Sequence, residues 1–235
     1  MQKNIFVMSN KGGTGKTTVA VNFAFLLSKK YSVGLLDADI HGPNAPKMLG
    51  MERQKSATAN NKIIPAKAGN NLYIMSVDFL SESQSQPIVW RGPLKTKLIN
   101  QFISDVEWPN LDFLIVDLPP GTGDETITIM QLLKENSEAI IVSTPQEVSL
   151  MDVGKIVNMA REFKIPIAGL IENMSGDIFG KGNVKKFADE QKVKFLGEIG
   201  LSKIIANSSN SGKPFVLEKN TDSYKQFNKI IQKII

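Results

Sequence analysis

A glycine-rich segment near the start of the chain constrains its fold more than any other feature. Residues 9–18 read Ser-Asn-Lys-Gly-Gly-Thr-Gly-Lys-Thr-Thr. An apolar run, residues 5–8, precedes them, and an apolar-periodic run begins at Val19. This is the order of strand, glycine-rich loop and helix that a phosphate-binding loop requires. The sequence therefore predicts an α/β fold in which this loop binds a nucleotide.

The residue types in this loop suit a bound triphosphate. Glycines tolerate positive φ and have no Cβ, so successive backbone N–H groups can turn toward an anion. The helix N-terminus adds partial positive charge. We expect Lys16 to reach the β- and γ-phosphates and the Thr17 hydroxyl to bind Mg²⁺. The loop residues expected to bind ATP are Asn10, Lys11, Gly12, Gly13, Thr14, Gly15, Lys16, Thr17 and Thr18.

Two positions depart from an ordinary P-loop. The usual pattern, G-x-x-x-x-G-K-[ST], begins with Gly where this chain has Asn10. Asn is the non-glycine residue that best tolerates the left-handed region, so the loop can still form. The second departure is Lys11, which would crowd Lys16 if both lay on the same γ-phosphate. We expect it to point across a two-fold interface at the nucleotide of a second copy and to act in hydrolysis from there.

Composition bounds the remaining possibilities. With 235 residues, of which 42% are hydrophobic, the chain is expected to form one large domain, residues 1–235. It has no cysteine, which excludes disulfides, thiolate metal sites and cysteine nucleophiles. A net charge of +5 without a long run of like charge argues against nucleic-acid binding by charge alone. No signal peptide and no bilayer-spanning apolar run is evident, so we expect a cytoplasmic protein.

Short apolar runs alternate with amphipathic stretches along the chain. The near-continuous Val/Ile/Leu runs predict a doubly wound α/β fold, with a mostly parallel sheet covered on both faces and ligands at the carboxyl ends of its strands. The polar segment 51–71 lacks clear periodicity and is interpreted as an insertion or a mobile excursion rather than a linker. The expected strands are 4–8, 32–37, 72–77, 113–117, 139–143, 167–171 and 195–199; the expected helices include 17–30, 93–104, 125–135, 149–163 and 183–191.

Three carboxylates follow strands at the edge where the loop is expected. Asp37 ends the strand 32–37, Asp39 lies two residues further on in the turn, and Asp117 ends the strand 113–117. We expect Asp117 to support Mg²⁺, as in a Walker B element, and Asp37 to lie near the Mg²⁺ shell. Phosphoryl transfer depends mainly on positioning and charge neutralisation, so Asp39 is expected to orient the attacking water.

Other polar residues at strand ends are candidates for the base site. Asn173 carries an amide that can read adenine by paired hydrogen bonds, and Pro214 is expected to help wall the base. His41 is the only histidine and is a candidate partner-sensing residue rather than a catalyst.

Several motifs resemble the Mrp/ApbC family of P-loop ATPases, which is related to MinD and ParA. The early lysine of the loop resembles the deviant Walker A signature of this class. Further likeness is carried by residues 34–44 (GLLDADIHGPN), 116–124 (VDLPPGTGD), 171–175 (IENMS) and 178–180 (IFG). Their order and spacing match from the first strand to Pro214.

The resemblance implies a homodimer in the ATP state that takes part in iron–sulfur cluster carriage or assembly. Family members that carry clusters place a Cys-x-x-Cys shortly after Glu-Asn-Met, and this chain passes through Met174-Ser175-Gly176 without one. We therefore expect a slow or partner-stimulated ATPase that assists cluster or metalloenzyme maturation. It would bind no iron–sulfur cluster itself and would act beside a client or a cysteine-bearing partner.

Two other roles stay open at this point. One is a ParA/MinD-like positioning switch, and the other is a nucleotide-binding regulator with little turnover. The final segment, residues 223–235, has one apolar helical stripe flanked by lysines. The stripe consists of Tyr224, Phe227, Ile230, Ile231 and Ile234. This stripe predicts a final helix docked on the sheet, with a membrane-surface helix as the lesser alternative.

Overall fold

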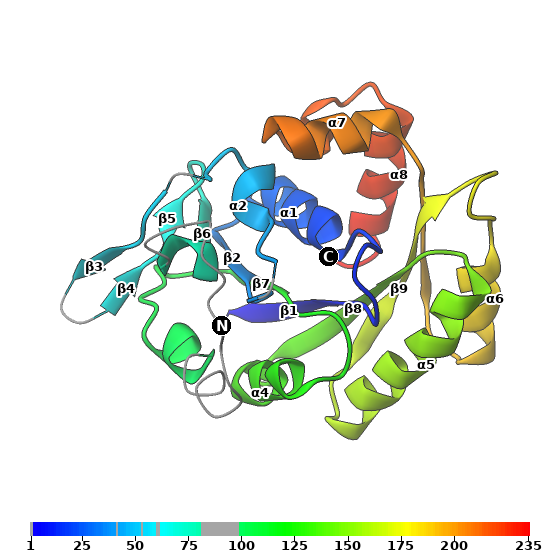
Figure 1. Ribbon diagram of the computed structural model, residues 1–235, viewed down its shortest axis with the longest axis horizontal. Helices are drawn as coiled ribbons and strands as arrows, with labels where there is room; N and C mark the ends of the chain where they lie inside the picture. Colours follow the sequence, from blue (N-terminus) through cyan, green and yellow to red (C-terminus); the bar gives the residue numbers. More distant parts are fainter. Residues whose placement is uncertain (1, 41, 53, 60–61, 81–98) are drawn as a thin grey trace.

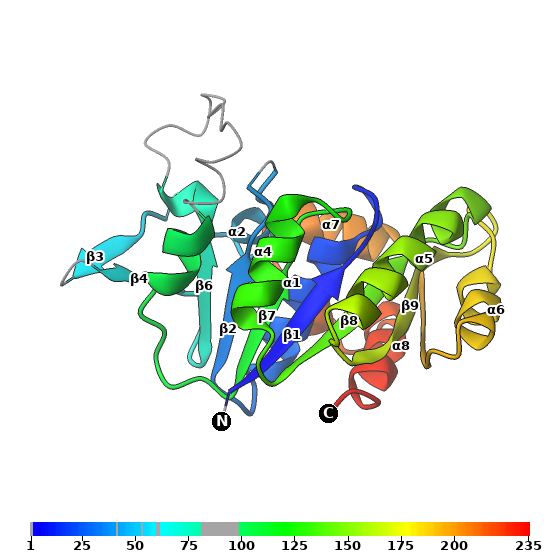
Figure 2. The same cartoon turned by 90° about the horizontal axis from the view of Figure 1, so that it is seen from below.

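The computed structural model describes residues 2–40, 42–52, 54–59, 62–80 and 99–235. Its centre is an eight-stranded sheet in the order β10-β9-β8-β1-β7-β2-β6-β5 (Figures 1 and 2). Every pairing in this sheet is parallel except that of β5 with β6. The strands are β1 (Lys3–Met8), β2 (Val33–Asp37), β5 (Ala66–Lys67), β6 (Leu72–Ser76), β7 (Phe113–Asp117), β8 (Ser137–Ser143), β9 (Ile167–Ser175) and β10 (Phe195–Gly200).

Helices cover both faces of this sheet, as a parallel sheet requires. Figure 1 shows α1, α2, α7 and α8 on one face and α4, α5 and α6 on the other. The central strands β1 and β7 are almost completely buried between these layers, and their apolar side chains join the helices in one core. The helices are α1 (Lys16–Leu27), α2 (Ala45–Met48), α4 (Asp124–Leu133), α5 (Glu147–Glu162), α6 (Asn183–Glu190), α7 (Lys203–Ser211) and α8 (Asp222–Ile231), with 3₁₀ turns η1 (Val77–Leu80) and η2 (Phe215–Leu217).

The predicted doubly wound α/β architecture is confirmed. Each of the seven expected strands corresponds to a strand of the sheet, although β9 continues four residues beyond the expected end at Ile171. The expected helix 93–104 is helical over 99–104, and its first part lies outside the described residues. Within the segment 51–71, the structure forms a small antiparallel pair, β3 (Ala57–Ala59) with β4 (Lys62–Ile64), and then the edge strand β5.

The last helix is docked on the sheet. On α8, Phe227, Ile230 and Ile231 are at most 4% exposed, and the helix packs on β10. The apolar stripe is therefore packed in the core, as the prediction of a final helix docked on the sheet requires. No helix in the described part of the chain is both long and apolar enough to cross a membrane.

Candidate nucleotide-binding site

The glycine-rich loop joins β1 to α1 at the carboxyl edge of the sheet. Gly13 and Gly15 have φ values of 79° and 85°, so the loop uses the left-handed region at two of its glycines. A cavity of about 570 Å³ lies against the loop and is lined by residues 11–18 together with Asp39, Asn44, Pro119 and Glu125. This volume falls within the range of small-molecule sites. The geometry therefore places an open recess where the sequence predicts the phosphates.

Asn10 does not adopt the left-handed conformation that its residue type would tolerate. The described non-glycine residues with positive φ do not include Asn10, so the left-handed tolerance of Asn is not used here. The turn that follows β7 instead contacts the start of the loop. The backbone N–H of Gly121 donates to the Ser9 carbonyl at 2.9 Å, which ties the Pro-Pro-Gly turn after β7 to the start of the loop.

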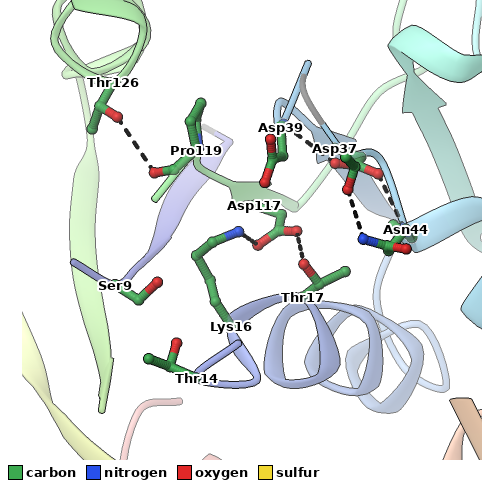
Figure 3. A network of polar contacts seen from close by, with 12 residues as sticks. Ser9, Thr14, Lys16, Thr17, Asp37, Asp39, Asn44, Asp117, Pro119 and Thr126 are labelled. Carbon is green, nitrogen blue, oxygen red and sulfur yellow. Dashed lines mark hydrogen bonds and ion pairs between the residues drawn. The ribbon is translucent and has the colours of Figure 1, made fainter. Parts of the chain in front are cut away.

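Lys16, Thr17 and Asp117 meet beneath the loop (Figure 3). The Lys16 Nζ donates to Asp117 Oδ1 at 2.6 Å, and the Thr17 hydroxyl donates to Asp117 Oδ2 at 2.6 Å. Lys16 is 6% exposed and Asp117 is fully buried. Burial raises the pKa of Asp117, and the charge and hydrogen bond of Lys16 oppose this rise. An ammonium has three N–H donors, so Lys16 can keep this ion pair and still donate to a phosphate oxygen.

The same oxygen atoms suit a magnesium ion. Thr17 Oγ1 and Asp117 Oδ2 are hard oxygen donors in direct contact, and Mg²⁺ in nucleotide sites takes one or two protein oxygens with phosphate and water. In the described ranges there is no group of three or more His, Cys, Asp or Glu residues that could hold a metal by themselves. Thr17 Oγ1 and Asp117 Oδ2 therefore fit the protein's share of the ligands in such a nucleotide site.

Asp37 is held by protein groups rather than directed into the cavity. Its carboxylate accepts hydrogen bonds from Ala45 N at 3.0 Å, Asp39 N at 3.3 Å and the Ser76 hydroxyl at 3.4 Å. Burial, followed by the charge of Asp117, raises its pKa from 3.8 to about 8. Asp37 thus fixes the ends of the turn that follows β2, and its place near the Mg²⁺ shell stays a prediction.

Asp39 and Lys11 reach the rim of the cavity in different ways. Asp39 lines the cavity and its charge raises the pKa of Asp117, so the two carboxylates lie near one another. Lys11 also lines the cavity, but its Nζ lies 3.0 Å from Asp152 Oδ2 and donates to the Val148 carbonyl at 3.3 Å. The ammonium is therefore turned onto α5, with 41% of its side chain exposed.

Asp152 is a functional candidate that the sequence did not show. A hydrogen bond from Lys155, together with Lys11, lowers the pKa of Asp152, so its carboxylate is charged near neutral pH. It lies 141 positions from Lys11 in the chain, and no motif spacing connects the two. Only the packing of α5 beside the loop brings them together.

Asn173 lies behind the loop. Its Nδ2 donates to the Thr14 carbonyl at 2.8 Å, and the side chain is 6% exposed. The adjacent Glu172, part of the motif IENMS, is fully buried and accepts hydrogen bonds from Ser175 Oγ, Gly182 N and Val184 N. In this structure Asn173 supports the loop, and its reading of adenine stays a prediction.

The remaining candidate residues are Pro214, Thr18 and His41. Pro214 is buried and directly precedes η2, whose Val216 N–H donates to Asn22 Oδ1 of α1 at 3.3 Å. Its role as a wall of the base site stays a prediction. Thr18 lies in the first turn of α1 and lines the cavity. His41 lies outside the described residues.

Comparisons with known proteins identify relatives of this chain. A family model described as ParA: NUBPL iron-transfer P-loop NTPase matches residues 1–235. The chain is 45% identical over 248 residues to the iron–sulfur cluster carrier protein of Methanocaldococcus jannaschii, covering 100% of this chain and 84% of that protein.

Two solved structures show the same architecture. A nucleotide-binding protein from Archaeoglobus fulgidus in complex with ADP superposes with a TM-score of 0.80 at 34% identity, covering 96% of this chain and 91% of that one. The septum site-determining protein MinD of Pyrococcus horikoshii, complexed with Mg-ADP, gives a TM-score of 0.80 at 23% identity over 100% of this chain and 96% of that one. The likeness to MinD shows the fold alone, and it confirms the predicted fold class.

Proposed function

The chain belongs to the ParA/NUBPL family of iron-transfer P-loop NTPases, and from that premise we propose that it is a Mg²⁺-dependent ATPase assisting iron–sulfur cluster or metalloenzyme maturation. The observation that carries the proposal is the convergence of Lys16 and Thr17 on the buried Asp117 beneath an open glycine-rich loop. The relative in Archaeoglobus fulgidus is a nucleotide-binding protein complexed with ADP, which supports nucleotide binding by this chain.

The loop residues bind the triphosphate in this proposal. Backbone N–H groups of residues 10–18 face the phosphates, and Lys16 donates to the β- and γ-phosphate oxygens. Thr17 and Asp117 would hold Mg²⁺, which would neutralise charge on the phosphates. Asp39, at the rim of the cavity, accepts a hydrogen bond from the attacking water and orients the water oxygen toward the γ-phosphorus. The products are ADP and inorganic phosphate.

A second copy completes the site. Lys11 leaves Asp152 and donates to phosphate oxygens bound by the partner, as an arginine finger does when supplied in trans. Two exposed apolar side chains of α5 accompany it: Val148 is 67% exposed and Met151 is 80% exposed. Exposed apolar groups beside a catalytic loop favour a protein interface there. Homodimerisation would therefore bury this face of α5 when ATP is present.

The cluster itself is handled without thiolates from this chain. The relative in Methanocaldococcus jannaschii is named an iron–sulfur cluster carrier protein, but this sequence contains no cysteine. Iron–sulfur clusters are held mainly by cysteine thiolates. The proposed role is to drive maturation through an ATP-dependent change of state, with the thiolates supplied by a partner or client.

Sedimentation with a non-hydrolysable ATP analogue, paired with a phosphate-release assay, tests this proposal. Wild-type protein should dimerise with the analogue and release phosphate from ATP. Lys11→Ala should bind ATP but lose both dimerisation and turnover, whereas Lys134→Ala, an exposed lysine beyond the end of α4, should behave as wild type. A Lys11→Ala protein that dimerises and hydrolyses normally would show that this lysine is only a solvated loop charge.

A further inference from the structure

A second large recess lies at the opposite end of α1 from the phosphate-binding loop. It has a volume of about 630 Å³ and lies between the end of α1, η2 and α8. Figure 1 shows α1 and α8 side by side on the same face of the sheet. The recess shares no lining residue with the cavity at the loop, so a ligand bound here would leave the proposed nucleotide site free.

The floor of this recess, which we call the α1–α8 groove, is apolar. Phe25, Tyr224 and Ile231 line it, and the side chains of Leu217 and Ile235 at its margin are 48% and 53% exposed. Ile231 is 4% exposed and belongs to the core, and Phe25 and Tyr224 are partly buried against it. The exposed side chains of Leu217 and Ile235 therefore leave apolar surface in contact with water that a ligand could cover.

The rim of the groove is basic. Lys29, Lys30 and Lys219 line it, and among the described residues no Asp or Glu side chain does. Within the described ranges none of the three lysines forms an ion pair, and the Lys29 ammonium lies 4.2 Å from the centre of the Phe25 ring. The nearest carboxylate in the sequence, Glu218, is exposed and is not among the lining residues.

We propose that the α1–α8 groove docks an acidic amphipathic segment of a protein partner. Apolar side chains of that segment would pack between Leu217, Tyr224 and Ile235, and its carboxylates would pair with the three lysines. Helix-in-groove recognition uses this combination of an apolar stripe and complementary charge. A volume of about 630 Å³ accommodates several side chains.

The shape of the groove favours a peptide over a lipid surface. A recess between three elements receives a convex ligand, whereas a membrane-surface helix lays an exposed apolar face on a flat bilayer. On α8 the strongest apolar residues, Phe227 and Ile230, are buried in the core and cannot insert into lipid.

Fluorescence anisotropy with a labelled designed peptide tests this proposal. The probe is a helical peptide of about 15 residues with leucines at i, i+3, i+4 and i+7 and glutamates on the flanking positions. It should bind the full chain, and the triple variant Lys29→Glu/Lys30→Glu/Lys219→Glu should bind at least about tenfold more weakly because attraction becomes repulsion. Leu217→Ser should weaken binding as well, and Lys134→Glu should not.

Three controls fix the interpretation. A peptide with glutamine in place of each glutamate should bind weakly to wild type, and ATP affinity should be the same in the triple variant and wild type. Vesicles of phosphatidylglycerol and phosphatidylcholine should not pellet the protein. The proposal is overturned if the peptide at millimolar concentration does not bind wild type, or if it binds wild type and the triple variant with equal affinity. It is also overturned if the protein binds vesicles, but not the peptide, through these lysines.

Discussion

Replacing Gly15 with alanine should disrupt the phosphate-binding loop through one specific contact. Gly15 has a φ of 85°, and a Cβ at this position would lie 2.0 Å from Asn173 Nδ2. The left-handed conformation costs a non-glycine residue about 1–2 kcal/mol. Displacing the Asn173 amide from the Thr14 carbonyl leaves buried polar groups unpaired, at a cost of about 1–3 kcal/mol. We therefore expect Gly15→Ala to lower the free energy of unfolding by about 2–5 kcal/mol.

Urea denaturation of a double-mutant cycle separates the two contributions. In an Asn173→Ala background the clash is absent, so Gly15→Ala should cost only the conformational part, about 1–2 kcal/mol. Gly12→Ala is the matched control, because its Cβ meets nothing within 4 Å and its backbone is not left-handed. It should change stability by less than about 0.5 kcal/mol. Equal costs of Gly15→Ala in both backgrounds would refute the contact between Asn173 and the loop.

Three further predictions concern catalysis, titration and cargo. Asp39→Ala should retain ATP binding but slow hydrolysis, because it removes water positioning more than ground-state binding; phosphate release at the wild-type rate would exclude this role. Folding raises the pKa of Asp37 from 3.8 to about 8. The contribution of Asp37 to the free energy of unfolding is therefore fully present below pH 3.8 and is lost as the pH rises to about 8. Urea denaturation of metal-free protein across this range should therefore show Asp37→Asn less pH-dependent than wild type, and identical slopes would contradict the assignment. Reconstitution with iron and sulfide should give no stable cluster, and stoichiometric iron and sulfide with charge-transfer absorption would show otherwise.

Much of this architecture was predictable because its signals are local. Each central strand is a short apolar run, which the sequence shows directly. Because the carboxyl ends of parallel strands meet at one edge of the sheet, Asp117 could be predicted to lie beside the loop. The helix α7 was missed because residues 203–211 include five Ser or Asn residues, which are typical of turns. It forms because the Ser202 side chain caps it by accepting from Ile204 N at 3.2 Å, and because it packs on α2 and η2.

The contacts that decide the detail of the site were not predictable in this way. The ion pair of Lys11 with Asp152 joins a loop to a helix that no sequence spacing relates to it. The position of Asn173 depends on β9 continuing to Ser175, which carries the amide behind the loop. Both contacts depend on how elements distant in the sequence pack together. The hydrophobic periodicity of the sequence does not predict that packing.

Calorimetric titration of Mg-ATP into wild type and Lys16→Ala tests the central claim most directly. The claim is that residues 10–18 bind the triphosphate and that the Lys16 ammonium donates to it from its place beside Asp117. A charge-assisted contact of this kind contributes about 1.5–3 kcal/mol, so ATP should bind the variant about 10- to 160-fold more weakly. Lys134→Ala should bind as wild type does. Equal ATP affinity in wild type and Lys16→Ala would contradict the account.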